Sequence, residues 1–541
     1  MHRGRLFLRM AEIAAALANR EDQAAEESRF TEWAIDQLQQ SPDPSHRLIG
    51  QRLAALMRPG RTILHEKGIY LMQSLALTEG ADSGVPPSDA EIAILALAVN
   101  DYAADWNKVG QGLTRDEMML ADFAHFARFN RHTDLVRELV RSDLIMGSFV
   151  PRHPGLDTAE SWRTFQEKVF GRTYSEQVER FLGPLALQAG LWMLPEGEPP
   201  VIVKKRWAAE TRGGAPEGEA FLDTLCISAD AVRSELRKLP SLDGVVRFPL
   251  PLYLTPFVEI DAGVLIGASP WLIEHQLAFG FWGKCLAEMK RSEAKYSHQT
   301  WFSVFGELFE CYCRWLADQV AHEPKFRAAH NHFVASRLGG EDEIEDVVLV
   351  GGRSAALFSC KARVMVAKDV RAAASPQSLI GWFDSFFFEE AEGEHRGGAF
   401  RLLDKKIAAI RTGRHEPRIM RGARLFPVIL TYDRVGESLY LTKWVRTRLQ
   451  RENLLQQDGI EGPLVLDVGS FEILMSLAAN GEDVFRILEL CLTSQVGAAT
   501  FHYVVRQHVA EHRNERLPAL ERAFGALRNR ILGQFRSEGN P

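Results

Sequence analysis

The sequence predicts an α/β protein with a large helical N-terminal region and a mixed sheet flanked by helices in its C-terminal half. Apolar residues recur at intervals of three to four through much of residues 1–195, which is typical of helices. Strand-like apolar runs begin after residue 200, and strands alternate with helical segments across residues 300–480. We therefore expect three regions: a helical region at 1–195, a β-containing connecting region at 196–275, and the sheet with its C-terminal helices at 276–541.

Composition limits the class of protein. A chain of 541 residues with 46% apolar residues is long enough for about three buried cores. The net charge of −7 gives no overall basic character, so a nucleic-acid surface would have to be a local patch. The six cysteines have no C-x-x-C spacing, which argues against structural zinc and disulfides and favours a reducing cytoplasm. No apolar run approaches 18 residues, so we expect no membrane span. Arg9 and Glu12 interrupt the apolar stretch near the N-terminus, so we expect no signal peptide.

The first two regions differ in their patterns. Helical periodicity in the first region predicts helices at Ala11–Leu38, Ile92–Trp106 and Glu117–Met146. Two stretches rich in proline and glycine, at 194–200 and 213–218, mark the change to the second region. Beyond them, apolar runs predict strands at Val245–Leu254 and Val264–Ile266.

The third region begins with a helical pattern at Trp301–Val320. After a hairpin, described below, the pattern predicts a helix at Phe400–Ile410 and a buried strand at Leu425–Thr431. A further strand at Pro463–Val468 leads into a helix at Phe471–Ala479.

The stretch Glu343–Val364 (EIEDVVLVGGRSAALFSCKARV) predicts a β-hairpin. Its arms are Val347–Val350 and Ala355–Cys360, joined by a Gly-Gly-Arg turn. Because side chains alternate along a strand, Asp346 shares a face with Val348, and Lys361 shares a face with Ser359. We expect the carboxylate and the lysine to point to one side at the same end of the hairpin, where a metal-bound water and a phosphodiester could meet.

This arrangement resembles the PD-(D/E)xK nuclease superfamily, in which an Asp on one strand is followed by Asp/Glu-x-Lys on the next. The segment Gly306–Tyr312 (GELFECY) is similar to the helix that precedes the hairpin in many members and carries a further Glu, here Glu310. The resemblance covers residues 300–430. The chain departs from the pattern at Ser359, which stands where the motif has Asp or Glu.

The resemblance implies roles for individual residues. Asp346 would bind Mg²⁺ or Mn²⁺, the backbone carbonyl of Cys360 would complete the coordination, and Lys361 would orient or activate the attacking water. The Cys360 side chain should point to the opposite face, into the core. The alternative interpretation of Asp346 and Lys361 is an ordinary surface hairpin with charged ends.

A carboxylate that replaces the one missing at Ser359 must come from outside the hairpin. We favour Glu310 as both catalytic residue and metal ligand, because small neighbours on its helix allow the helix to approach the sheet. The alternative interpretation of Glu310 is a glutamate without a site role, present because helices favour glutamate in their N-terminal half, where it interacts well with the helix dipole. The other candidates are Asp369, Glu389 and Glu390, although the glutamates between 389 and 394 are more simply a solvated acidic loop.

A basic segment at Arg401–Arg424 follows the hairpin. We expect this segment to bind the phosphates along a nucleic-acid strand. The alternative interpretation is a helix face that is charged only because it is exposed to solvent. The candidate nucleic-acid-binding residues are Lys405, Lys406, Arg411, Arg414 and Arg418. The aromatic run at 382–388 suits hydrophobic core or a subunit contact better than base stacking.

The sequence thus leads to a cytoplasmic, metal-dependent endonuclease that hydrolyses phosphodiester bonds of DNA and resembles restriction-like and antiphage-defence effectors. The N-terminal region would serve regulation, target recognition or partner binding. Because the chain has no P-loop motif, any energy-dependent activity requires a partner such as an NTPase subunit. Association with further copies of the same chain, as a homo-oligomer, is a second kind of partnership that the sequence leaves open. The alternative function is a nuclease-fold subunit that has lost cleavage and binds DNA or acts as a scaffold.

Overall fold

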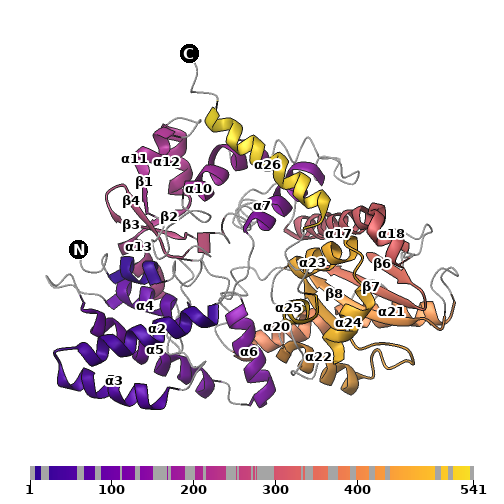
Figure 1. Cartoon of the computed structure of the whole chain (residues 1–541), viewed down its shortest axis with the longest axis horizontal. Helices are drawn as coiled ribbons and strands as arrows, with labels where there is room; N and C mark the ends of the chain where they lie inside the picture. The colour runs from indigo at the N-terminus through magenta and orange to yellow at the C-terminus, as the bar shows by residue number, and fades with distance from the viewer. Residues whose placement is uncertain are drawn as a thin grey trace.

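The computed structural model shows a mixed α/β protein that is mostly helical (Figure 1). It describes residues 6–13, 23–57, 66–79, 87–109, 112–127, 135–149, 167, 172–188, 201–210, 215–238, 252, 255–269, 272–273, 276, 298–330, 333–335, 345–362, 376–389, 398–413, 421–432, 439–493, 501–509 and 516–536.

The strands form two separate mixed sheets. The smaller has the order β1-β4-β3-β2 and consists of β1 (Val201–Val203), β2 (Cys226–Ser228), β3 (Phe257–Asp261) and β4 (Val264–Gly267). The larger, at the right of Figure 1, has its strands in sequence order: β5 (Phe333–Ala335), β6 (Val347–Gly351), β7 (Ser354–Lys361), β8 (Arg424–Thr431) and β9 (Leu464–Asp467).

The N-terminal region is helical where the structure describes it. Its elements are α2 (Gln23–Gln40), α3 (Pro44–Leu56), α4 (Glu66–Glu79), α5 (Asp89–Val109), α6 (Arg115–Ala127), α7 (Leu135–Asp143), the π-helix η1 (Leu144–Phe149), α9 (Tyr174–Gln177), η3 (Val178–Leu182) and α10 (Gly183–Gln188). The small sheet adds α11 (Lys204–Glu210), α12 (Ala215–Asp223) and α13 (Ala229–Lys238).

The single helix predicted at Glu117–Met146 is wrong. Helix α6 ends at Ala127 and α7 begins at Leu135. Two helices therefore lie in a stretch whose apolar residues recur at one continuous helical spacing. The start of α6 has a local cause, because the Thr114 hydroxyl accepts a hydrogen bond from the Glu117 amide while the Glu117 carboxylate accepts one from the Thr114 amide. The predicted strand at Val245–Leu254 lies almost entirely outside the described residues.

The C-terminal region contains α17 (His298–His322), α18 (Pro324–His330), α20 (Pro376–Phe388), α21 (Ala399–Arg411), α22 (Leu439–Glu452), α23 (Val468–Ala479), α24 (Val484–Thr493), α25 (Phe501–His508) and α26 (Pro518–Arg536). The helices predicted at 301–320, 400–410 and 471–479 are confirmed within a few residues, as are the strands at 425–431 and 463–468. None of the helices in the described part of the chain is both long enough and apolar enough to span a bilayer.

The pairing of the larger sheet brings several strand ends to one edge. Strands β7, β8 and β9 are parallel, and Lys361 pairs with Thr431, which pairs in turn with Asp467. Strand β6 is antiparallel to β7, with Val347 opposite Phe358. The start of β6 therefore lies at the same edge as the carboxyl ends of the other three strands.

Helices cover both faces of this sheet. On one face, Leu349 and Phe358 join a core with Phe309 of α17 and Phe471 of α23. On the other, Val348 and Leu357 pack with α20, α21, α22 and α6. The aromatic run of α20 belongs to this second core, with Phe383 and Phe387 at most 1% exposed, which confirms that it is core rather than a base-stacking surface.

An acidic site at one end of the central hairpin

The hairpin forms as the sequence predicts. Strands β6 and β7 are joined by a two-residue turn in which Gly352 has a φ of 58°, a left-handed conformation that glycine adopts without a steric penalty. The opposite end of the hairpin carries Glu345 and Asp346 just before β6 and Lys361 as the last residue of β7.

Asp346 is 6% exposed and is held by contacts to two elements. Its Oδ2 accepts a hydrogen bond of 2.6 Å from the backbone N–H of Cys360 on β7. From α17, Arg314 Nε donates to the Asp346 carbonyl at 3.1 Å, and Arg314 Nη2 lies 4.0 Å from Asp346 Oδ1. The carboxylate is thus fixed between β7 and α17.

Glu310 reaches the same guanidinium. Its Oε2 lies 3.4 Å from Arg314 Nη2, one helical turn along α17. The apolar side of α17, which includes Phe309 and Cys313, is fully buried against the sheet, so its partly exposed residues lie along the border of the contact. Glu310 and Asp346 therefore approach one nitrogen atom from two different elements.

The predicted sharing of a face by Asp346 and Lys361 is wrong. The chain bends at Asp346, before β6 begins at Val347, so the alternation does not extend to it and its carboxylate turns toward α17. The neighbouring residue Glu345 lies on the α21 side, where its Oε2 is 2.5 Å from Lys406 Nζ. Alternation places Lys361 on this same side, and its charge acts on the Glu345 carboxyl.

Glu345 is the acidic residue that the sequence reasoning missed. Its side chain is only 1% exposed, and its Oε1 has no hydrogen-bond partner among the described residues. Burial raises the pKa of the Glu345 carboxyl, and the charge of Asp346 adds to this, whereas Lys406 and Lys361 lower it. Glu345 was visible in the sequence next to Asp346, but which side of the sheet it faces depends on the bend.

The residues between the acidic side chains are buried. Ser359 is 1% exposed, and the Cys360 thiol is buried on the α17 face as predicted. Burial raises the pKa of the Cys360 thiol well above its usual value, as does its contact with Cys313. The thiol is therefore protonated at neutral pH, so the atom of Cys360 that would bind a metal ion is its backbone carbonyl oxygen.

Much of the basic segment has intramolecular partners. Besides the Lys406 contact, Arg411 donates to the carbonyls of Arg421 and Asp458, and Arg424 pairs with Glu461 and Glu489. Lys405 is exposed.

Several candidates lie away from the site or beyond what the structure describes. Glu389 is exposed and accepts a hydrogen bond from Ser385, four residues before it in the chain. Asp369, Glu390, Arg414 and Arg418 lie outside the described residues.

A second polar cluster was not anticipated. Arg141 of α7 is 1% exposed and makes a two-point contact with Glu472 of α23, through Nε at 2.7 Å and Nη2 at 3.0 Å. It also pairs with Glu138 at 2.7 Å, while the Tyr312 hydroxyl of α17 donates to Glu472. Because Arg141 and Glu472 are 331 residues apart, no local pattern could have revealed the pair.

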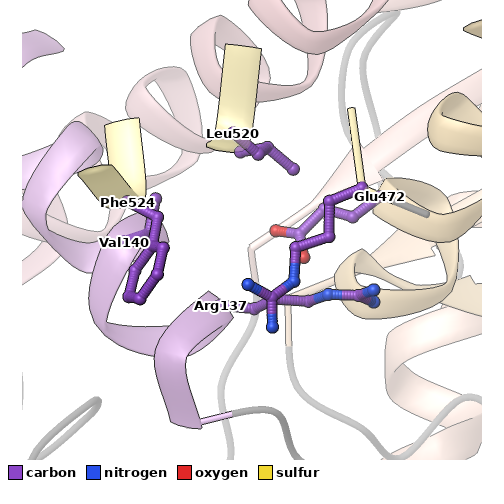
Figure 2. Close-up of a pocket in the computed structure, with 6 residues that line it drawn as sticks. Arg137, Val140, Glu472, Leu520 and Phe524 are labelled. Atoms are coloured by element: carbon purple, nitrogen blue, oxygen red, sulfur yellow. The ribbon is translucent and has the colours of Figure 1, made fainter. Parts of the chain in front are cut away.

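A small pocket lies beside this cluster, and Figure 2 shows the side chains that line it. It is lined by Arg137 and Val140 of α7, Glu472 of α23, and Arg516, Leu520 and Phe524. Its free space is about that of one water molecule, too small for a substrate.

Two further findings bear on the site: the grouping of possible metal ligands among the described residues, and the comparison of the chain with known proteins. Within the described ranges, no three His, Cys, Asp or Glu side chains are grouped so that they could hold a metal ion. No protein-family model, no curated protein and no solved structure matches this chain.

Proposed function

We propose that the protein is a metal-dependent endonuclease of the PD-(D/E)xK type that cleaves DNA. The observation that carries the proposal is the approach of Glu310 Oε2 and Asp346 Oδ1 to within 4.0 Å of one nitrogen of Arg314. Two carboxylates from a helix and a hairpin thereby meet around one cationic group at the edge where β7, β8 and β9 end. The helix α17 before the hairpin and the helices on both faces of a mixed sheet also support it.

The donor groups suit a hard divalent cation. Mg²⁺ prefers oxygen ligands and commonly binds through one or two carboxylates together with water. Asp346, Glu310 and the carbonyl of Cys360 would hold it, and the bound cation would supply an activated water and neutralise charge on the phosphate. Lys361 ends β7 on the other side of the hairpin, so its long side chain would have to reach past the edge of the sheet to bind and orient the phosphodiester. Buried Ser359 carries no charge with which to attract a cation.

A second candidate function has support from the same contacts. Arg314 already neutralises both carboxylates, and Asp346 Oδ2 is used by the Cys360 amide. A site of this kind is also expected in a nuclease-fold subunit that binds DNA, or serves as a scaffold, without cleaving it. Both proposals are compatible with a role in an antiphage-defence system that includes an NTPase partner.

Incubating the purified protein with supercoiled plasmid and Mg²⁺ or Mn²⁺ tests the two functions. We expect nicking by the wild type and its loss, with folding intact, in Asp346→Asn, Lys361→Ala and Glu310→Gln. Glu307→Gln, an exposed glutamate one turn earlier on α17, is the matched control and should remain active.

Ser359→Glu separates the outcomes further. If Glu310 supplies the missing carboxylate, a glutamate at the buried Ser359 position should give no gain in nicking. A wild type that does not nick, together with a Ser359→Glu variant that does, would support the non-cleaving subunit. Full activity in a well-folded Lys361→Ala variant would remove Lys361 from the catalytic assignment.

A further inference from the structure

Arg314 lies at the centre of the acidic site, although the resemblance gives this position no role. Its guanidinium makes three contacts at once: Nε with the Asp346 carbonyl, and Nη2 with both Asp346 Oδ1 and Glu310 Oε2. The side chain is 13% exposed, so it is held at the border of the core rather than free in solvent. A positive group therefore already occupies the space that the two carboxylates share.

The charges of the site require such a group. Glu310 and Asp346 would repel one another across a partly buried space if no cation lay between them. The nearby lysines contribute on the other side of the hairpin, since Lys406 pairs with Glu345 and the charge of Lys361 also acts there. Arg314 is thus the cationic group that the structure places against both carboxylates.

We propose that Arg314 is a built-in counter-ion of the acidic site, and that a divalent cation binds Glu310 and Asp346 only when the Arg314 side chain moves away. The inference deepens the proposed nuclease function, because it assigns regulation to the same site. A guanidinium and a metal ion cannot occupy the shared space together. Arg314 therefore lowers the affinity of the resting protein for the cation.

The proposal predicts a gain of cation affinity when Arg314 is removed. Titration calorimetry with Mn²⁺ alone should show binding to Arg314→Met that is on the order of tenfold tighter or more than to the wild type, because a unit charge about 4 Å away no longer competes. Asp346→Asn combined with Arg314→Met should lose the gain. Circular dichroism without metal confirms that each variant is folded.

Arg401 offers a matched control. Its Nε donates to the Phe388 carbonyl and its guanidinium pairs with Glu452, so it makes the same kinds of contact as Arg314 on the other side of the sheet. Arg401→Met should leave the Mn²⁺ affinity unchanged. Equal gains in Arg314→Met and Arg401→Met would overturn the proposal, as would no gain in Arg314→Met, which would leave Arg314 a structural ion pair.

A measurement on the unmodified protein covers the case in which Arg314→Met does not fold. Mn²⁺ should increase the reaction of Arg314, but not of Arg401, with the arginine reagent phenylglyoxal, read by peptide mass spectrometry. Unchanged labelling of Arg314 would contradict the proposal. Neither readout depends on cleavage. Tighter Mn²⁺ binding by Arg314→Met, in a protein that never nicks DNA, would support the counter-ion and refute the nuclease. Nicking by the wild type, with no gain of Mn²⁺ affinity in Arg314→Met, would support the nuclease and refute the counter-ion.

Discussion

The buried contact between α7 and α23 should be the costliest one to break. Arg141 is buried and bonds to Glu472 through two nitrogens and to Glu138 through a third, with both carboxylates at most 4% exposed. Arg141→Met is similar in length but removes the charge. Because it leaves two buried carboxylates without their cation, we expect a cost of about 3–5 kcal/mol, the range for breaking a buried ion pair from one side.

Urea unfolding at pH 8, followed by circular dichroism, measures this cost. Since a chain of this size need not unfold in one step, hydrogen exchange of peptides from α7 and α23 should report the local change. Arg530→Met is the control, because Arg530 is 40% exposed and pairs with Asp143 and Glu179 in the same neighbourhood. It should cost at most about 1 kcal/mol. An Arg141→Met cost below about 1 kcal/mol at pH 8 would refute the reasoning.

Three further outcomes are expected. Glu345→Gln should stabilise the protein at pH 8 and lose that advantage as the pH falls toward 4, because the raised pKa of Glu345 makes its charged form costly in the folded state; equal midpoints at pH 8 would contradict this. Gly398→Ala should destabilise the start of α21 by about 1–3 kcal/mol, since a Cβ would lie 2.3 Å from the Phe388 nitrogen; an unchanged thermal midpoint would count against it. Replacing Lys405, Arg414 and Arg418 with glutamine should flatten the slope of log DNA affinity against log salt, and an unchanged slope would assign the segment to a solvated face.

The sequence alone determined the elements whose cause is local. The alternation of apolar residues and the glycine turn predicted β6 and β7, and the apolar runs predicted β8 and β9, because period and turn chemistry act within a few residues. The position of Glu310 on a helix that packs against the hairpin was also readable, since small and aromatic neighbours mark the buried side of α17.

Only the tertiary structure decided the side-chain partners. The bend at Asp346 reverses which of Glu345 and Asp346 faces α17, and one residue of difference is enough because side chains alternate between faces. Arg314 was visible four residues after Glu310, yet its contact with Asp346 depends on how α17 lies against the hairpin. Arg141 and Glu472 meet because two distant helices pack together, and a charge buried by packing must find its partner wherever the fold brings one.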